Sequence, residues 1–247
     1  MSPAPDRPLL AIAGMTKSFG GFVALDNVSV DINKGERFDL IGPNGSGKTT
    51  LINCISGALA PQRGSVTFAG EDVTSLPAYL RARRGIARSF QIPRPFRSMT
   101  VVENLMVALD FAAGHAVFES AEHRHEAATA ILSRIGLAAR AEAPTTTLTQ
   151  VELRKMELAR ALAARPKLLI SDEAMAGLSG SEVDEVLELL LGLAADGITI
   201  IMIEHIMQAV MKFSERVMCL DAGRIIALGT PDQVMADRRV QEAYLGA

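Results

Sequence analysis

A glycine-flanked lysine most constrains what this chain can fold into. Residues 42–50 fit the phosphate-binding pattern G-x-x-x-x-G-K-[ST], between the apolar run that ends at Leu40-Ile41 and a helical-looking segment over 51–55. Glycines let successive backbone N–H groups face one phosphate, and the following helix adds its positive N-terminal end. Lys48 can then reach the β- and γ-phosphates, and the Thr49 hydroxyl can ligate Mg²⁺. The strand-before, helix-after context disfavours the alternative, an ordinary glycine-rich loop. The predicted loop consists of Gly42, Pro43, Asn44, Gly45, Ser46, Gly47, Lys48, Thr49 and Thr50.

Composition and charge restrict the class of protein further. With 247 residues and 49% hydrophobic content, the chain can bury a large core, as one domain or as a domain with an insertion. A net charge of −3 gives no global attraction to nucleic acid or to anionic lipid. Cys54 and Cys219 form no metal or redox spacing, so we interpret them as buried apolar residues in a reducing cytoplasm. The N-terminus does not read as a signal peptide, and the apolar run 198–203 is too short to span a bilayer, so we expect a soluble chain.

Short strands are predicted on both sides of the loop. Residues 9–32 are typical of short strands broken by turns at 17–21 and 26–27, with apolar and polar side chains alternating over 28–32, which indicates a small antiparallel sheet. Phe19 lies beside two glycines in this region, and the residues alone favour a core position for it over an exposed one. Asp39 lies in the strand 37–41 that feeds the loop, where a buried carboxylate needs a partner or a raised pKa. A further strand is expected at 65–68.

The middle third is predicted to be helical and opens on a basic stretch. Residues 81–97 carry six arginines together with Phe90, Gln91 and Phe96. Such a run favours a solvated face or a protein-docking surface over a nucleic-acid site. Thr100 is suited to cap a helix over 101–109, and apolar spacing predicts helices over 119–135 and 151–165. His123 and His125 are two residues apart, which suits exposed helix positions and not a metal pair.

Two later strands are predicted to deliver polar residues to one sheet edge. The apolar run 168–173 ends in Asp172 and Glu173, and the run 198–203 is followed by Glu204 and His205. Ligands of open α/β sheets lie at the carboxyl ends of parallel strands, which favours function for the two acids over a solvated strand end. His205 remains open between a structural and a functional role. Between these strands, the pattern 181–184 suggests a capping box that opens a helix ending near Gly197. A hairpin around 221–223 and a helical tail over 233–245 complete the prediction.

In this order the residues resemble the nucleotide-binding subunit of ABC transporters along nearly the whole chain. The loop at 42–50 resembles Walker A, and 168–173 resembles Walker B with its catalytic glutamate. Gln91 occupies the place of the Q-loop glutamine, His205 that of the switch histidine, and Phe19 that of an aromatic stacked on adenine, which reverses the interpretation of Phe19 given above. The resemblance implies an α/β fold, a P-loop NTPase (RecA-like) core with an N-terminal antiparallel β subdomain and an inserted α-helical subdomain. It places the core at 1–95 and 162–247 and the helical subdomain at 96–161.

A finer resemblance points to one branch of that family. The stretches 89–91, 95–96, 99–105, 203–207 and 242–246 are similar to the ATPases of branched-chain amino acid uptake systems. Those systems pair two ATPase subunits with two transmembrane permease subunits and a periplasmic or extracellular solute-binding protein. The resemblance therefore implies these partners, no nucleic acid, and a cytoplasmic location on the inner face of the membrane. The six-arginine stretch would form part of the surface under the membrane partner.

By the same resemblance, ATP and Mg²⁺ are the expected cofactors. Lys48 and the loop amides would hold the phosphates, while Thr49, Gln91 and Asp172 would be the metal ligands, Gln91 also sensing the attacking water. Glu173 would act as general base on that water, and His205 would hold the γ-phosphate. The expected catalytic residues are Glu173, His205, Gln91 and Lys48.

Departures from the family pattern are also present. The family signature Leu-Ser-Gly-Gly-Gln is replaced by the sequence 148–152, Leu-Thr-Gln-Val-Glu, so both glycines are lost; Ala174 and Ser179 also depart from the pattern. In the family this segment contacts ATP held by the opposite subunit, and the side chains of Gln150 and Val151 should hinder that approach. We therefore expect the chain to work best beside a different ATPase subunit with an intact signature, although a homodimer stays open.

Three functional classes remain at this point. The leading one is the ATP-hydrolysing subunit of an importer of branched-chain amino acids or a related small polar or amide solute, and a lipid exporter would use a similar ATPase. The second is a soluble non-transport ABC ATPase, which usually carries tandem cassettes or long coiled-coil insertions that this chain lacks. The third is a regulatory module with little turnover, which the presence of Glu173 and His205 disfavours.

Overall fold

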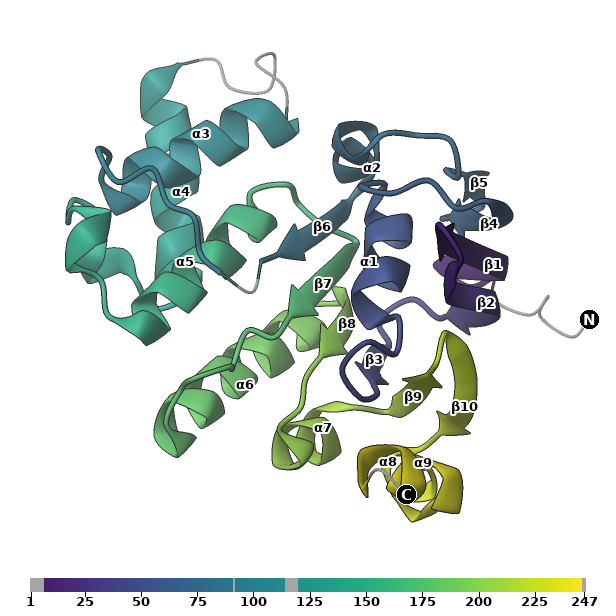
Figure 1. Ribbon diagram of the computed structural model, residues 1–247. Coiled ribbons are helices and arrows are strands. Elements are labelled where there is room, and N and C mark those ends of the chain that lie inside the picture. The colour runs from purple at the N-terminus through teal and green to yellow at the C-terminus, as the bar shows by residue number, and fades with distance from the viewer. Residues whose placement is uncertain (1–6, 91, 114–119, 246–247) are drawn as a thin grey trace, which may run out of the picture.

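The chain folds around two β-sheets that lie on either side of helix α1 (Figure 1). The computed structural model describes residues 7–90, 92–113 and 120–245. The smaller sheet is antiparallel, with the strand order β2-β1-β4-β5, as the alternation in the N-terminal segment predicts. Its strands are β1 (Leu10–Phe19), β2 (Phe22–Ile32), β4 (Arg63–Phe68) and β5 (Glu71–Asp72).

The larger sheet has six strands in the order β10-β9-β3-β8-β7-β6. Neighbours from β9 to β6 run parallel, and only the β9–β10 hairpin at the edge is antiparallel. The strands are β3 (Arg37–Ile41), β6 (Ile86–Ser89), β7 (Leu168–Asp172), β8 (Thr199–Ile203), β9 (Arg216–Asp221) and β10 (Arg224–Gly229). This mixed sheet and the antiparallel one confirm the predicted α/β fold.

Helices cover both faces of the six-stranded sheet, and α3, α4 and α5 gather in a lobe away from the small sheet (Figure 1). The helices are α1 (Lys48–Ser56), α2 (Ala78–Arg84), α3 (Val101–Ala113), α4 (Ala121–Arg134), α5 (Gln150–Leu162), α6 (Gly180–Ala195), α7 (Met207–Phe213), α8 (Pro231–Ala236) and α9 (Arg238–Leu245). Thr100 caps α3 as predicted, because its hydroxyl accepts from the Glu103 N–H and its own N–H donates to the Glu103 carboxylate. Within the described ranges, none of the helices combines the length and the apolar character that crossing a bilayer requires.

Alternate residues of the central strands belong to two separate hydrophobic cores. Leu168 and Ile170 of β7 pack with α1 and the small sheet, whereas Leu169 packs with the helical lobe and α6. Strand β8 divides in the same way. Ile201 and Ile203 pack with α1 and the small sheet, whereas residues 200 and 202 pack with the helical lobe and α6. Because both faces are covered, these strands read as continuous apolar runs.

Three predictions about local structure were wrong in detail. Helix α6 begins after Ser179 and not after Ser181, because the Glu182 carboxylate reaches back to the Ser179 N–H at 2.8 Å. The C-terminal tail forms two helices, α8 and α9, separated at Asp237, whose extended backbone ends the first one. Helix α5 ends at Leu162, three residues before the predicted end.

The buried Asp39 behaves as the sequence requires. Burial, reinforced by the nearby carboxylate of Glu204, holds the pKa of Asp39 well above its ordinary value. The Ser214 hydroxyl also donates a hydrogen bond of 3.4 Å to its Oδ2. Both cysteines are buried free thiols, in agreement with the interpretation of their spacing.

Candidate functional site

Three adjacent strands bring the predicted residues to one edge of the six-stranded sheet. Strand β3 leads into the loop at 42–50, β7 ends at Asp172, and β8 lies between them and is followed by Glu204 and His205. The pairing is in register, since Asp172 lies opposite Ile203 and the Glu173 N–H donates to the Ile203 carbonyl at 3.0 Å. The carboxyl ends of the strands therefore meet where the sequence predicts a ligand.

The loop wraps its lysine against its own backbone. Lys48 is buried, and its Nζ donates to the carbonyls of Gly42 at 2.6 Å and Pro43 at 3.0 Å. Burial lowers the pKa of Lys48, while the negative charges of Glu173 and Asp172 oppose that shift, which places the acids within electrostatic reach of the amine. Helix α1 begins at this lysine, so its N-terminal dipole points into the loop.

The acids and the histidine lie together beside the loop. His205 Nε2 is 3.1 Å from Glu173 Oε1, so the two side chains share a hydrogen bond. Thr49, Asp172 and Glu173 line one cavity of about 520 Å³. A hydroxyl and a carboxylate are the hard oxygen ligands that Mg²⁺ takes when phosphates and water complete its shell. Within the described ranges, no group of three or more His, Cys, Asp or Glu could hold a metal by itself.

Arg88 is a member of the site that the sequence analysis did not assign. From the end of β6, its guanidinium donates to Asp172 Oδ2 at 2.6 Å and to Asn53 Oδ1 on α1 at 2.6 Å. Both ion-pair partners are only 13% exposed. Arg88 thus ties the strand-end acid to the helix that follows the phosphate loop. Its place in the six-arginine stretch gave no sign of this contact.

Glu204 is a second residue that the analysis named without assigning a role. Its side chain is buried, and Oε1 accepts a hydrogen bond of 2.9 Å from the Met175 N–H. Burial is the main cause that raises the pKa of Glu204 to about 7. The residue thereby fixes the segment after β7 to the strand end that carries His205.

One predicted contact with nucleotide, Phe19, lies outside this cluster, and a second falls on a residue that the structure does not describe. Phe19 ends β1 with 46% of its surface exposed, and the Lys17 ammonium lies 5.4 Å from its ring centroid. The ring is thus an exposed aromatic surface on the small sheet, and its role toward adenine stays a prediction. Gln91 lies outside the described residues.

The segment at 148–152 caps a helix. The Thr149 hydroxyl accepts from the Glu152 N–H at 3.3 Å, and the Glu152 carboxylate accepts from the Thr149 N–H at 2.8 Å. Arg140 Nε lies 3.2 Å from Glu152 Oε1. A carboxylate of the same chain therefore already bonds a backbone donor at the start of α5. Gln150 is exposed there.

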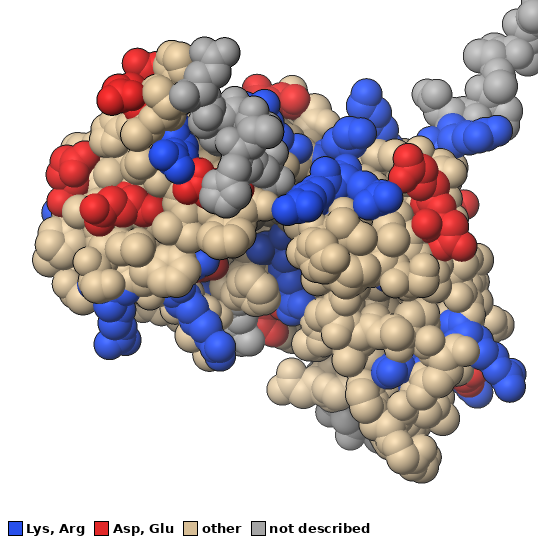
Figure 2. All heavy atoms as spheres, turned by 90° about the horizontal axis from the view of Figure 1, so that it is seen from above, with Lys and Arg blue, Asp and Glu red and all other residues tan. Residues whose placement is uncertain are grey.

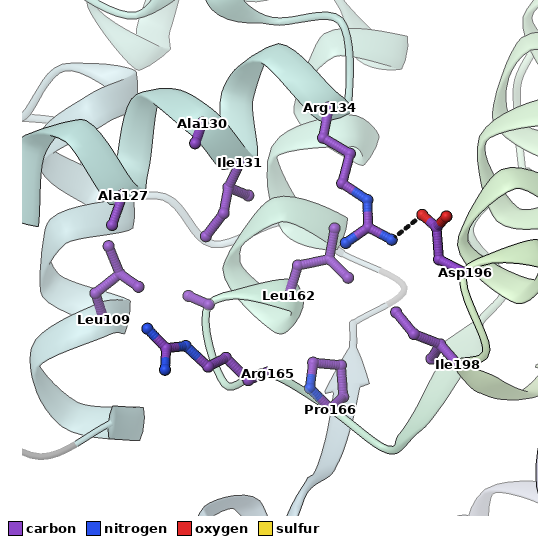
Figure 3. Close-up of a pocket in the computed structure, with 11 residues that line it drawn as sticks. Leu109, Ala127, Ala130, Ile131, Arg134, Leu162, Arg165, Pro166, Asp196 and Ile198 are labelled. Atoms are coloured by element: carbon purple, nitrogen blue, oxygen red, sulfur yellow. Dashed lines mark hydrogen bonds and ion pairs between the residues drawn. The ribbon is translucent and has the colours of Figure 1, made fainter. Parts of the chain in front are cut away.

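A separate cavity of about 560 Å³ lies between α4 and the amino-terminal ends of β7 and β8 (Figure 3). Its walls include Ile131 of α4, Leu162 of α5, and Pro166 and Ile198, which precede the two strands. An ion pair between Arg134 and Asp196 joins the lobe to the end of α6 across its rim. Because ligand sites of such sheets lie at the opposite, carboxyl edge, we interpret this cavity as a packing seam of the lobe.

Comparison with known families agrees with this geometry. The family model described as ABC transporter matches residues 25–176, more than half of the chain. This chain belongs to the ABC transporter family. A second model, described as a branched-chain amino acid ATP-binding cassette transporter, matches residues 224–247. As a member, the chain is an ATP-binding and ATP-hydrolysing subunit, and the predicted family is confirmed.

Individual ABC proteins match along their whole length. The high-affinity branched-chain amino acid transport ATP-binding protein BraF of Pseudomonas aeruginosa is 36% identical over 97% of this chain and 98% of its own. LivG of Escherichia coli, described in the same words, is 37% identical with the same coverage. The lipopolysaccharide export ATP-binding protein LptB of Haemophilus influenzae is 33% identical over 96% of this chain and 97% of its own.

Solved structures of ABC proteins show the same fold. A crystal structure of a nucleotide-free ATP-binding cassette superposes with a TM-score of 0.88 and 33% identity, covering 97% of this chain and 99% of that one. The ADP conformation of a cassette gives 0.86 and 33% identity, with the same coverage. The ABC fold is therefore established for this chain, including a P-loop NTPase core.

Proposed function

We propose that this chain supplies the energy for uptake of branched-chain amino acids or of a related small polar or amide solute. The match of residues 224–247 to the branched-chain amino acid branch carries this proposal. The relatives BraF and LivG support it, since they match the chain from end to end. An export role is the second candidate, favoured by the likeness to LptB.

The proposed mechanism uses the residues gathered at the sheet edge. Lys48 exchanges the carbonyls of Gly42 and Pro43 for the β- and γ-phosphates, helped by the loop amides. Thr49, Asp172 and Gln91 would hold Mg²⁺, which offsets phosphate charge when it is bound.

Glu173 acts as general base on the attacking water, and it is held for this by His205 at 3.1 Å. His205 in turn contacts the γ-phosphate. Phe19 stacks on adenine from the small sheet, which its exposure permits.

The end of the molecule that carries α2 and α3 supports a membrane-subunit interface. Figure 2 looks onto that end and shows Lys and Arg gathered around the hollow between the two lobes. Phe90, Ile92 and Phe96, which precede α3 in the chain, are all exposed, and a cavity of about 580 Å³ is lined by Ile92, Arg94 and neighbours. Aromatic and arginine side chains of this kind are typical interface anchors. We propose that this face binds the permease subunits.

Only some of the six arginines belong to this surface, which corrects the sequence interpretation. Arg81 is 1% exposed and bonds backbone carbonyls inside the core. Arg88 pairs with Asp172 in the catalytic cluster. Arg83, Arg84, Arg94 and Arg97 remain as the exposed or part-exposed basic residues.

We also propose a second ATPase subunit as partner. The carboxylate of Glu152 at the start of α5 disfavours a γ-phosphate brought by the opposite subunit, which supports pairing with a chain that has an intact signature. Residues 96–161 would act as the helical subdomain that presents this segment. The assembly would lie on the cytoplasmic face of the membrane, with a solute-binding protein on the other side.

Reconstitution into liposomes tests the proposal. The chain, a partner ATPase, two permeases and the solute-binding protein should hydrolyse ATP faster when leucine, isoleucine or valine is added. The isolated chain should turn over slowly. Stimulation by lipopolysaccharide or another lipid, with no response to any amino acid or amide, would refute import and favour export.

A further inference from the structure

The last helix of the chain contacts the beginning of the phosphate loop. The Gly42 N–H donates a hydrogen bond of 2.8 Å to the hydroxyl oxygen of Tyr244 on α9. The two residues are 202 positions apart, and in Figure 1 the C-terminal helices lie beside the end of the sheet. Gly42 is buried, so without this phenol its N–H would lose a partner in a place that water does not easily reach.

Gly42 is also constrained on its other sides. Its carbonyl accepts the Lys48 hydrogen bond of 2.6 Å. Its backbone has a φ of +145°, and a Cβ built there would lie 2.1 Å from the Leu220 carbonyl oxygen of β9. A side chain is therefore excluded at this position, and the backbone of Gly42 is bonded at both its polar groups, by Tyr244 at the N–H and by Lys48 at the carbonyl.

We propose that Tyr244 is a positioning residue for the phosphate loop. By bonding the Gly42 N–H it fixes the residue whose carbonyl holds Lys48 at rest, so the loop meets a nucleotide already in its binding shape. A loop that is ordered in advance loses less conformational entropy when it closes on phosphate. The proposal rests on the proposed phosphate-binding role of the loop and adds a role for α9 in it.

The chemistry of the phenol suits this task. Desolvation raises the pKa of Tyr244 to about 12, so the hydroxyl stays neutral at physiological pH and keeps a lone pair for the amide. Tyr244 as a residue is 40% exposed and does not belong to the buried core. In a purely structural role the contribution of Tyr244 would come from packing of its ring, whereas in the positioning role it comes from the hydrogen bond of its hydroxyl.

Tyr244→Phe separates these two roles because it removes only the hydroxyl. The matched control is Tyr79→Phe, at the other tyrosine of the chain, which is 62% exposed on α2. Loss of one hydrogen bond to a buried amide should weaken ATP binding by about three- to tenfold in calorimetry. In the assembled complex KM should rise by a similar factor, and kcat should change less than about twofold. Tyr79→Phe should leave the dissociation constant unchanged.

A second measurement avoids disturbing the contact. The chain has no tryptophan and two tyrosines, so the Tyr79→Phe protein reports fluorescence from Tyr244 alone. Because the contact is already formed before ATP binds, this emission should stay nearly constant while calorimetry detects binding. Unchanged ATP affinity in Tyr244→Phe, or a large change in this emission on ATP binding, would overturn the inference. Absence of ATP binding by the wild-type chain would instead refute the proposed function.

Discussion

Replacing Arg81 should destabilise the fold far more than replacing any other arginine of its helix. Its guanidinium lies inside the core and donates to four carbonyls, those of Cys54 at 2.6 Å, Ile55 at 2.7 Å, Thr74 at 2.7 Å and Leu76 at 2.9 Å. Two of these carbonyls belong to the last turn of α1, which has no later helical partner for them. Arg81 thus caps the helix that begins at the phosphate loop.

The expected magnitude follows from these contacts. Four hydrogen bonds at a net contribution of about 1 kcal/mol each give about 4 kcal/mol. Arg81→Met keeps an apolar stem of similar length but leaves all four carbonyls without that donor. Burial already disfavours the charge, as the lowered pKa of Arg81 indicates, so part of the loss is recovered when the charge is removed. We expect the free energy of unfolding to fall by about 3 kcal/mol net, and the thermal unfolding midpoint to fall by about 6–12 °C.

Urea denaturation followed by circular dichroism measures this loss. Arg83→Met is the matched control, because Arg83 lies on the same helix, is exposed, and has its guanidinium 5.9 Å from the centroid of the Tyr79 ring. It should change the free energy of unfolding by no more than about 0.5 kcal/mol. A loss below about 1 kcal/mol for Arg81→Met, or equal losses in the two variants, would show that water satisfies the carbonyls and would refute the reasoning.

Three further predictions concern the site. Glu173→Gln should retain ATP while hydrolysis falls by at least about 100-fold, measured by single-turnover assay; unchanged hydrolysis would exclude Glu173 as the base. Because the pKa of Glu204 is raised to about 7 from 4.5, its contribution to stability is complete below pH 4.5 and is lost as the pH rises through about 7. Glu204→Gln should remove that pH dependence, and equal urea midpoint profiles for variant and wild type would contradict this. Glu152→Gln keeps the capping acceptor but removes the negative charge at α5, so the ATPase rate of a homodimer should rise several-fold, and a fall would contradict the proposed mismatch.

Residues that belong to contiguous motifs could be placed from the sequence. Lys48, Asp172 and His205 each follow an apolar strand run, and parallel strands deliver their carboxyl ends to one edge, so motif and topology give the same answer. Local capping was predictable at Thr100 for the same reason, since the partner lies three residues away. It failed at Ser181, because the pair Ser181 and Asp184 has the same spacing as Ser179 and Glu182, the pair that forms the cap.

Contacts between distant segments could not be placed in this way. Arg88 meets Asp172 only because β6 pairs with β7 in a register that composition does not encode. Arg81 and Arg83 are two positions apart in the sequence, yet the side chain of Arg81 is buried in the core and that of Arg83 is exposed to solvent. Helical periodicity separates these faces in principle, but a charged side chain on the inner face breaks the apolar pattern that would reveal it.

The position of the site follows from the way the two cores share the central strands. Alternate residues of β7 and β8 are buried in different cores, so neither strand can shift by one residue without exchanging all its contacts. The backbone of the residues directly after these strands is held in place by that fixed register, and their side chains are not needed for packing in either hydrophobic core. A carboxylate and an imidazole placed there are held at 3.1 Å by the backbone beneath them. The proposed catalytic groups, Glu173 and His205, are therefore held in place because the interior of the sheet is apolar on both faces, and a cavity-forming change such as Ile201→Ala should loosen the two side chains together.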